Sequence, residues 1–224
     1  MIIVVNRYLF GLVLGLLSLC VCAAENSVND LTNDSCLPYE LKSSAYDYRK
    51  QDRHSRWLAK DIWNAHIHPA INQMRTDNGR GIGGSAAGNL DYALKWIPND
   101  PRSLKAVIDY SFLIKSKPQH VPLIRAPGCY LKKAIRFVPD DPMPRFLYGY
   151  YLYKKKQYEG AIVWYERGLK IDPDSSEGHY NLGLTLVKLK RYKEAQDHAR
   201  IAYKLGYPLP WLRHKLSKLG YPIN

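Results

Sequence analysis

Residues 166–175, ERGLKIDPDS, decide the fold, because apolar residues at helical spacing run there into a proline. Two earlier stretches follow the same pattern: DYALKWIPNDP at 91–101 and KKAIRFVPDDP at 132–142. The stretches are offset by 41 and then 34 residues, and about 34 residues is the period of arrays of helix-turn-helix units. A unit of this size cannot bury its apolar face alone and must stack on its neighbours. The sequence therefore predicts an all-α solenoid of helical hairpins.

Apolar residues at spacings of three and four predict the helices of this array. The expected helices cover 53–74, 85–97, 103–116, 128–138, 144–155, 158–171, 176–189 and 192–205. We interpret residues 25–82 as a leader with a non-repeat helical segment and residues 83–224 as repeats. The clearest units are 142–175 and 176–209. A last helix at 209–219 is expected to cap the array, with Trp211, Leu212, Leu216 and Leu219 on its buried side.

Small and aromatic residues recur at fixed places in the two clearest units. They are Gly149, Ala161, Tyr165, Gly168 and Pro173 in the first unit, and Leu182, Gly183, Leu186, Ala195 and Ala202 in the second. This pattern resembles the tetratricopeptide repeat. The whole chain also resembles exported bacterial tetratricopeptide proteins of unassigned activity, through its YDYR stretch at 46–49 and its Tyr-Pro ending. The resemblance implies a protein-interaction scaffold without chemistry of its own.

The first 24 residues read as an export signal. Arg7 is their only charge, residues 8–22 form an apolar run, and small residues follow at 23–24. That run is shorter than the roughly 20 residues needed to span a bilayer, so a cleaved signal peptide is preferred over an uncleaved anchor. Lipid anchoring at Cys20 is not expected, because the bulky Leu19 stands where a lipobox has a small residue. The bacterial periplasm is the predicted location.

Cleavage would leave Cys36 and Cys129 as the two cysteines of the mature chain. In an exported protein, two cysteines favour one structural disulfide over a metal site. Two free thiols are the alternative. The bridge would connect the N-terminal segment to the repeats.

The chain is basic, with a formal net charge of +13 that falls to +12 without residues 1–24. In an exported protein this balance favours anionic envelope surfaces, acidic proteins or simple solubility, and we expect no nucleic acid partner. A membrane-surface association stays open, and the oligomeric state is not predicted.

Known chemical motifs give no catalytic or cofactor prediction. The GRGIGG stretch at 79–84 contains G-x-G-x-x-G, but a nucleotide-binding reading needs a preceding strand, so we interpret it as a flexible turn between helices. His66 and His68, two apart on a helix, cannot ligate one metal. His54, Asp61 and His179 are too scattered to complete a metal site. We therefore predict no metal, no cofactor and no enzyme activity.

Aromatic residues fall on the positions that line the concave groove in tetratricopeptide repeats. The resemblance implies a partner-binding groove formed by Phe146, Tyr150, Tyr153, Lys154, Tyr180, Asn181 and Lys188. Such a groove suits a segment with aromatic or acidic side chains. Packing of the same aromatics between helices is the alternative.

The resulting prediction is a non-catalytic periplasmic adaptor that binds a protein or peptide. The alternative is an envelope-associated structural protein that holds anionic lipid or polysaccharide through its basic surface.

Overall fold

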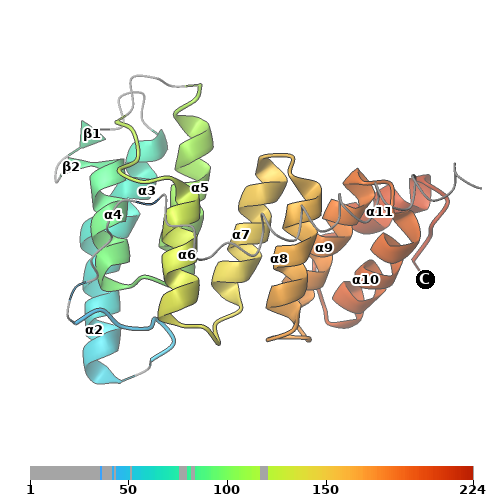
Figure 1. Ribbon diagram of the computed structural model, residues 1–224, viewed down its shortest axis with the longest axis horizontal. Helices are drawn as coiled ribbons and strands as arrows, with labels where there is room; N and C mark the ends of the chain where they lie inside the picture. Colours follow the sequence, from blue (N-terminus) through green and yellow to red (C-terminus); the bar gives the residue numbers. More distant parts are fainter. Residues whose placement is uncertain are drawn as a thin grey trace, which may run out of the picture. The chain divides into compact units, whose positions relative to one another are not determined.

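The computed structural model describes residues 36, 42, 44–50, 52–75, 80–81, 84–116 and 121–223. The expected export signal, residues 1–24, lies outside the described residues. Within Ser35–Asn224, which forms one compact unit, the described chain is almost entirely helical (Figure 1). Its elements are α2 (Arg53–Ile62), η1 (Trp63–Ile67), α3 (His68–Arg75), β1 (Arg80–Gly81), β2 (Gly84–Ser85), α4 (Ala86–Trp96), α5 (Pro101–Leu113), α6 (Pro127–Phe137), α7 (Met143–Lys154), α8 (Tyr158–Leu169), α9 (Ser176–Lys188), α10 (Tyr192–Lys204) and α11 (Trp211–Lys218).

The helices stack in chain order. From α3 to α10, each helix packs against the next one along the sequence. In addition, α5 reaches past α6 to contact α7. The same skipping contact joins α3 to α5, α7 to α9 and α9 to α11. This pattern of neighbour and next-but-one contacts is what a solenoid of helical hairpins requires. The all-α prediction is confirmed for the described residues.

Local sequence signals set the helix ends. Asp100 accepts a hydrogen bond from the backbone N–H of Ser103 at 2.8 Å, and Ser175 accepts one from that of Gly178 at 3.1 Å. These side chains satisfy backbone donors that the first turn of a helix leaves unpaired. Between the two helices of a hairpin, Lys156 and Lys190 adopt left-handed backbone angles, with φ of 62° and 60°. These two positions are one 34-residue period apart, so the turn geometry repeats with the sequence.

The strands form one small exception to the helical fold. β1 and β2 pair as an antiparallel hairpin of two residues each, with Arg80 opposite Ser85 and Gly81 opposite Gly84. The sequence predicted a flexible turn without strands here. No βαβ unit surrounds this hairpin in the described part of the chain, so the arrangement that a nucleotide fingerprint needs is not formed.

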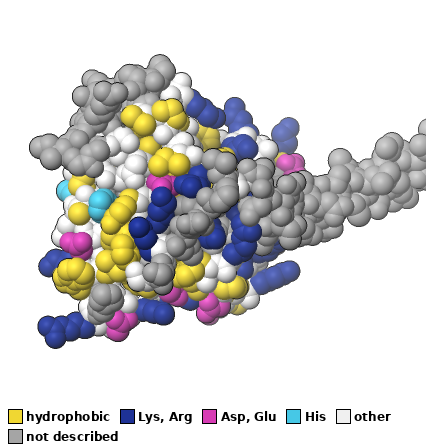
Figure 2. All heavy atoms as spheres, turned by 60° about the vertical axis from the view of Figure 1, so that its left-hand side comes forward, with side chains coloured by type: hydrophobic (Ala, Val, Ile, Leu, Met, Phe, Trp, Pro, Cys, Tyr) yellow, Lys and Arg dark blue, Asp and Glu magenta, His cyan; other side chains and the backbone are white. Residues whose placement is uncertain are grey.

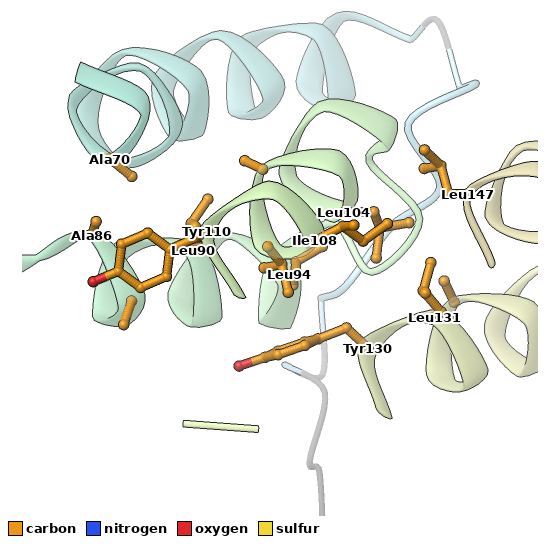
Figure 3. Packing of buried hydrophobic residues seen from close by; sticks show 14 residues of the cluster. Ala70, Ala86, Leu90, Leu94, Leu104, Ile108, Tyr110, Tyr130, Leu131 and Leu147 are labelled. Carbon is orange, nitrogen blue, oxygen red and sulfur yellow. The ribbon is translucent and has the colours of Figure 1, made fainter. Parts of the chain in front are cut away.

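Two buried clusters form most of the core. The first lies where α4, α5 and α6 meet α3 and α7, and its labelled residues point toward one another in Figure 3. Tyr110 and Tyr130 are fully buried there, and their hydroxyls donate to the Val121 carbonyl at 2.7 Å and to Asp91 Oδ1 at 2.8 Å. These two buried phenols therefore keep their hydrogen bonds, as burial of a polar group requires. The second cluster joins α7 to α11.

A disulfide links Cys36 to Cys129 at the start of α6, with 5.7 Å between the two Cα atoms. The chain after Cys36 is held by backbone hydrogen bonds to the end of α4: Lys42 N–H donates to the Lys95 carbonyl, and Tyr46 N–H donates to that of Trp96. We call residues 42–50 the strap. The predicted bridge is thus present, and it joins the N-terminal segment to the repeats.

The strap also spans the turns that end α4 and α6. Asn99 donates from one amide nitrogen to Asp47 Oδ1 at 2.7 Å and to Asp141 Oδ2 at 2.8 Å. Arg49 pairs with Asp47 at 2.7 Å and with Asp140 at 3.0 Å. Burial raises the pKa of Asp141 despite the hydrogen bond from Asn99. The two equivalent turns, Pro-Asn-Asp-Pro and Pro-Asp-Asp-Pro, are therefore tied together through the YDYR stretch.

The C-terminal helix differs from the prediction at one residue. Leu212 and Leu216 are fully buried, but Trp211 is 53% exposed. The helix begins at Trp211, two residues later than expected, and successive helix positions differ by about 100°. Leu212 and Leu216 therefore share the face toward α9 and α10, whereas Trp211 lies beside that face. The expectation that Trp211 is buried is wrong.

Among the helices of the described residues, none has the length and apolar character needed to cross a membrane.

Candidate functional site

The first helices of three successive hairpins, α5, α7 and α9, lie next to one another, and one face of each contributes to a shared surface. Because α5 touches α7 and α7 touches α9, residues that share a helix face meet across these contacts. Such a face repeats at spacings of three, four and seven residues. On α5 it carries Lys105 and Asp109, on α7 Tyr150 and Lys154, and on α9 Asn181, Leu184 and Lys188. We call this set the first-helix surface.

Tyr150 is the aromatic centre of this surface. Its hydroxyl donates to Asp109 Oδ1 at 2.9 Å, and Lys105 Nζ lies 5.5 Å from the centre of its ring. Lys105 also forms an ion pair with Asp109 one helical turn away. Burial, together with the hydrogen bond to Asp109, raises the pKa of the phenol well above its usual value. Tyr150 therefore stays a neutral hydrogen-bond donor and presents a partly buried ring between α5 and α7.

Basic side chains lie around a second ring, that of Phe112 on α5. Lys154 is exposed one turn after Tyr150, and its Nζ lies 5.1 Å from the centre of the Phe112 ring. Lys115 Nζ approaches the same ring at 5.0 Å. Phe112 in turn meets Tyr151 edge-on, with ring centres 6.3 Å apart. Because ammonium groups are attracted to aromatic faces, this arrangement holds positive charge next to a partly exposed aromatic cluster.

Tyr153 lies at the α8 side of the surface. It is half-buried and meets Tyr158 edge-on at 5.6 Å between ring centres. Burial raises its pKa, and nearby Tyr158 adds to the shift. Its hydroxyl is therefore neutral at physiological pH, and part of its ring remains available for contact.

Phe146 and Tyr180 are core residues, which corrects the predicted groove. Phe146 is 5% exposed and fills space that Gly168 and Gly178 leave empty, since a Cβ on either glycine would come within 2.8 Å of its ring. Tyr180 is 4% exposed and stacks on Tyr207 with ring centres 4.0 Å apart. Phe146 is covered by α8 and the start of α9, and Tyr180 is covered by Tyr203 of α10 and by Tyr207 just after that helix. Helix periodicity alone does not reveal that cover.

Asn181 and Lys188 lie further along α9. Asn181 is half-buried, and its backbone carbonyl accepts a hydrogen bond from the Thr185 hydroxyl at 2.8 Å. Lys188 is exposed near the end of the helix, and Leu184 lies between the two on the same face. The structure thus gives α9 one polar, one apolar and one basic group on this side.

Sequence reasoning missed Lys105 and Asp109, because the groove prediction was drawn only from the two clearest units, 142–175 and 176–209, and these residues lie in α5, in the hairpin before them. Their spacing of four residues with opposite charges was the available signal.

Sequence reasoning also missed the pairing of His179 with His198. Their Nδ1 atoms lie 2.9 Å apart, and their rings stack with centres 5.1 Å apart. His179 Nε2 contacts the Pro173 carbonyl at 2.9 Å, so this pair ties α9 and α10 to the preceding turn.

The arrangement is suited to binding through rings, hydrogen bonds and charges. No group of three or more potential metal ligands lies together in the described residues. Asp109, the carboxylate of the first-helix surface, accepts a hydrogen bond from the Tyr150 hydroxyl and forms an ion pair with Lys105. Partly exposed aromatic rings beside polar and charged groups are features of surfaces that recognise proteins.

Comparisons with known proteins agree with the fold. A family model described as TPR repeat matches residues 149–190, and one described as tetratricopeptide repeat matches residues 176–206. These matches cover α8, α9, α10 and the second half of α7. The protein therefore belongs to the class of proteins built from stacked helical hairpins. Residues 149–206 thus carry tetratricopeptide repeats within this array.

Two solved structures resemble the fold. PilF of Pseudomonas aeruginosa aligns with a TM-score of 0.52 and 20% identity, over 72% of this chain and 69% of that chain. A double mutant of MamA from strain RS-1 aligns with a TM-score of 0.49 and 17% identity, over 72% of this chain and 83% of that one. No curated protein matches the sequence. At 20% identity the likeness to PilF shows the fold alone.

Proposed function

We propose that this protein is a non-catalytic adaptor that binds a protein or peptide on its first-helix surface. The observation that carries the proposal is Tyr150, a half-buried ring held between two hairpins by Asp109 and Lys105. A rigid aromatic side chain loses little conformational freedom on binding, which is why such residues are enriched among interface hot spots. The ring is already oriented before a partner arrives.

The chemistry of the surface favours a partner segment with aromatic and acidic side chains. Tyr150 and Tyr153 offer ring faces and edges for apolar contact. Lys154 and Lys188 are exposed on the same side and would meet carboxylates. Asn181 is the one residue that matches the carboxylate clamp of chaperone-binding tetratricopeptide proteins, so capture of a free C-terminus is not part of the proposal.

We further propose that the protein acts in the bacterial periplasm. Support comes from the signal-like residues 1–24 and from the Cys36–Cys129 disulfide, since such bonds persist in oxidising compartments. N-terminal sequencing of the protein from a periplasmic extract tests this location. A mature chain that starts near Glu25 supports export, and a cytoplasmic protein that keeps Met1 contradicts it.

A Tyr150→Ala substitution tests the binding surface. Once a partner is isolated from the envelope, we expect this change to weaken its binding by roughly 1–3 kcal/mol, the range for an aromatic hot spot. Tyr150→Phe should retain most of the affinity, because the ring remains. Tyr92→Ala, on an exposed tyrosine of α4, serves as the control. Isothermal titration calorimetry gives the affinities, and circular dichroism confirms that each variant is folded.

Two outcomes contradict the proposal. Full affinity in a folded Tyr150→Ala protein would remove the first-helix surface from binding. Binding that disappears above physiological ionic strength, whatever residue stands at 150, would instead favour charge-driven attachment to anionic lipid or polysaccharide.

A further inference from the structure

α11 has a buried face and an exposed face. Leu212 and Leu216 are buried against α9 and α10, and the Leu212 side chain occupies the space beside Gly183. Trp211, Lys215 and Lys218 are exposed, and their spacings of four and seven residues place them on one side of the helix. We call these three residues, with Leu209 before them, the α11 outer face. The helix is thus anchored on one side and presents a tryptophan and two lysines on the other.

Exposed apolar groups on this face are held in place. Leu209 is 54% exposed and Trp211 is 53% exposed. Between them and the repeat lies Tyr203, whose hydroxyl donates to the Leu209 carbonyl at 3.0 Å and accepts from the Arg213 backbone N–H at 2.9 Å. The Arg213 guanidinium also covers the Tyr203 ring at 4.4 Å. The backbone that carries Leu209 and Trp211 is therefore fixed while their side chains face outward.

The surrounding sequence is strongly one-sided in charge. Residues 198–224 contain no aspartate or glutamate, and their basic residues are Arg200, Lys204, Arg213, Lys215 and Lys218. Other parts of the surface mix the two signs, as on the face in Figure 2, where acidic side chains lie among the basic ones. Arg200 pairs with Asp197 at 3.1 Å, and Lys204, Arg213, Lys215 and Lys218 concentrate positive charge at the same end as the exposed tryptophan.

We propose that the α11 outer face binds the surface of an anionic phospholipid bilayer. Tryptophan favours the level of the lipid headgroups, where its ring is apolar and its N–H can stay hydrated. Leu209 would enter the acyl boundary beside it, as the apolar side of an interfacial helix does. The lysines would meet phosphate groups, and each basic residue near an anionic membrane strengthens binding roughly fivefold. With eight residues, α11 is too short to span a bilayer and would lie on its surface.

The attachment would leave the first-helix surface free, because the two sites are carried by different residues. Lys154 and Tyr150 are on α7, whereas the outer face follows α10. A partner held on α5, α7 and α9 would then be kept at a membrane. This inference does not depend on the identity of that partner.

Vesicle sedimentation of the whole protein tests the proposal. The probes are vesicles of phosphatidylcholine alone and vesicles with about one third phosphatidylglycerol. We expect binding to the anionic vesicles and weak or no binding to the neutral ones. The triple variant Trp211→Ala/Lys215→Gln/Lys218→Gln should lose roughly twentyfold or more of that binding, because it removes two charges and the ring. All proteins carry the same N-terminus, so residues 1–24 contribute equally to each.

A matched control comes from α2, which also has an exposed tryptophan among basic residues. Trp57→Ala/Arg56→Gln/Lys60→Gln removes the same kinds of side chain and the same charge, and it should bind as the unchanged protein does. Circular dichroism melting of each variant establishes that it is folded. As a second measurement, a blue shift in tryptophan fluorescence on adding anionic vesicles should be reduced in Trp211→Phe.

Three results would overturn the proposal. The first is equal binding by the α11 triple variant and the unchanged protein. The second is equal loss in the α2 control, which would mean that net charge alone drives binding. The third is failure to bind anionic vesicles while poly-glutamate binds through Trp211, which would assign the face to an acidic protein.

Discussion

Gly149 lies where α7 and α8 approach most closely. A Cβ at this position would come within 2.8 Å of the Tyr165 ring, and Tyr165 is fully buried and has little room to move. Gly149→Ala should therefore destabilise the fold by about 1–3 kcal/mol through overpacking. Urea denaturation followed by circular dichroism measures this change in the free energy of unfolding.

Gly128 supplies the matched control in α6. A Cβ there would meet the Tyr148 hydroxyl at 3.5 Å, an ordinary contact. Because alanine is a better helix former than glycine, Gly128→Ala should be neutral or stabilise the protein by up to about 1 kcal/mol. Similar destabilisation by both substitutions would show that the close approach of Tyr165 to Gly149 does not cause the loss of stability in Gly149→Ala.

Single residues also show which structural features could be predicted from the sequence and which could not. Gly149 was predictable, because a small residue recurs at that place in the family and its reason is local to one hairpin. Phe146 and Tyr180 were misassigned to an open surface, because Phe146 fills the space left by glycines in α8 and α9 and Tyr180 is covered by Tyr207 beyond α10. Tyr150 keeps part of its ring exposed on the same helix face as the buried Phe146. Burial at such positions depends on three-dimensional neighbours that periodicity does not specify.

At the scale of elements, α11 covers the end of the second core cluster. Leu212, Leu216 and Ile223 are buried there, and Gln196 Nε2 donates to the Pro222 carbonyl at 2.6 Å. A chain that ends at Tyr207 would expose the α9 and α10 faces that these residues cover. At about 1.5–3 kcal/mol for each buried aliphatic side chain, we expect a loss of roughly 5 kcal/mol in stability.

The truncation is checked by thermal melting and by light scattering for aggregation. Trp211→Ala is its control, because an exposed side chain contributes little to packing and should leave the melting temperature nearly unchanged. An unchanged melting temperature after truncation at Tyr207 would mean that α11 does not protect the array.

Helix positions were the most predictable elements. The helices of 142–205 follow the expected ranges to within two residues, since both the apolar spacing and the turn residues repeat there. The role of the strap was not predictable. Asn99 lies 52 residues after Asp47, and Asp140 lies 91 residues after Arg49, so the hydrogen bonds within these two pairs exist only once the turns are stacked.

At the scale of the whole described unit, the disulfide and the strap hold the N-terminal segment on the repeats. Cys36 and Cys129 are 93 residues apart. Closing a loop of that length in the unfolded chain contributes about 4–5 kcal/mol in the chain-entropy account. The double variant Cys36→Ser/Cys129→Ser should be destabilised by about that amount in urea denaturation.

Reductant provides the control for this prediction. It should lower the stability of the unchanged protein to that of the double variant and should leave the double variant unaffected. Equal stability of the oxidised protein and the double variant would show that the bridge does not stabilise the fold.

The central claim is that partners bind on the first-helix surface, and site-specific photo-crosslinking in cells tests it most directly. A photoreactive phenylalanine at Lys154 would report on this surface, and the same residue at Ile201, exposed on the second helix α10, would report on another face. We predict a discrete crosslinked product from position 154 that is lost with Tyr150→Ala and is absent from position 201. Equal products from both positions, or a product only from position 201, would contradict the claim.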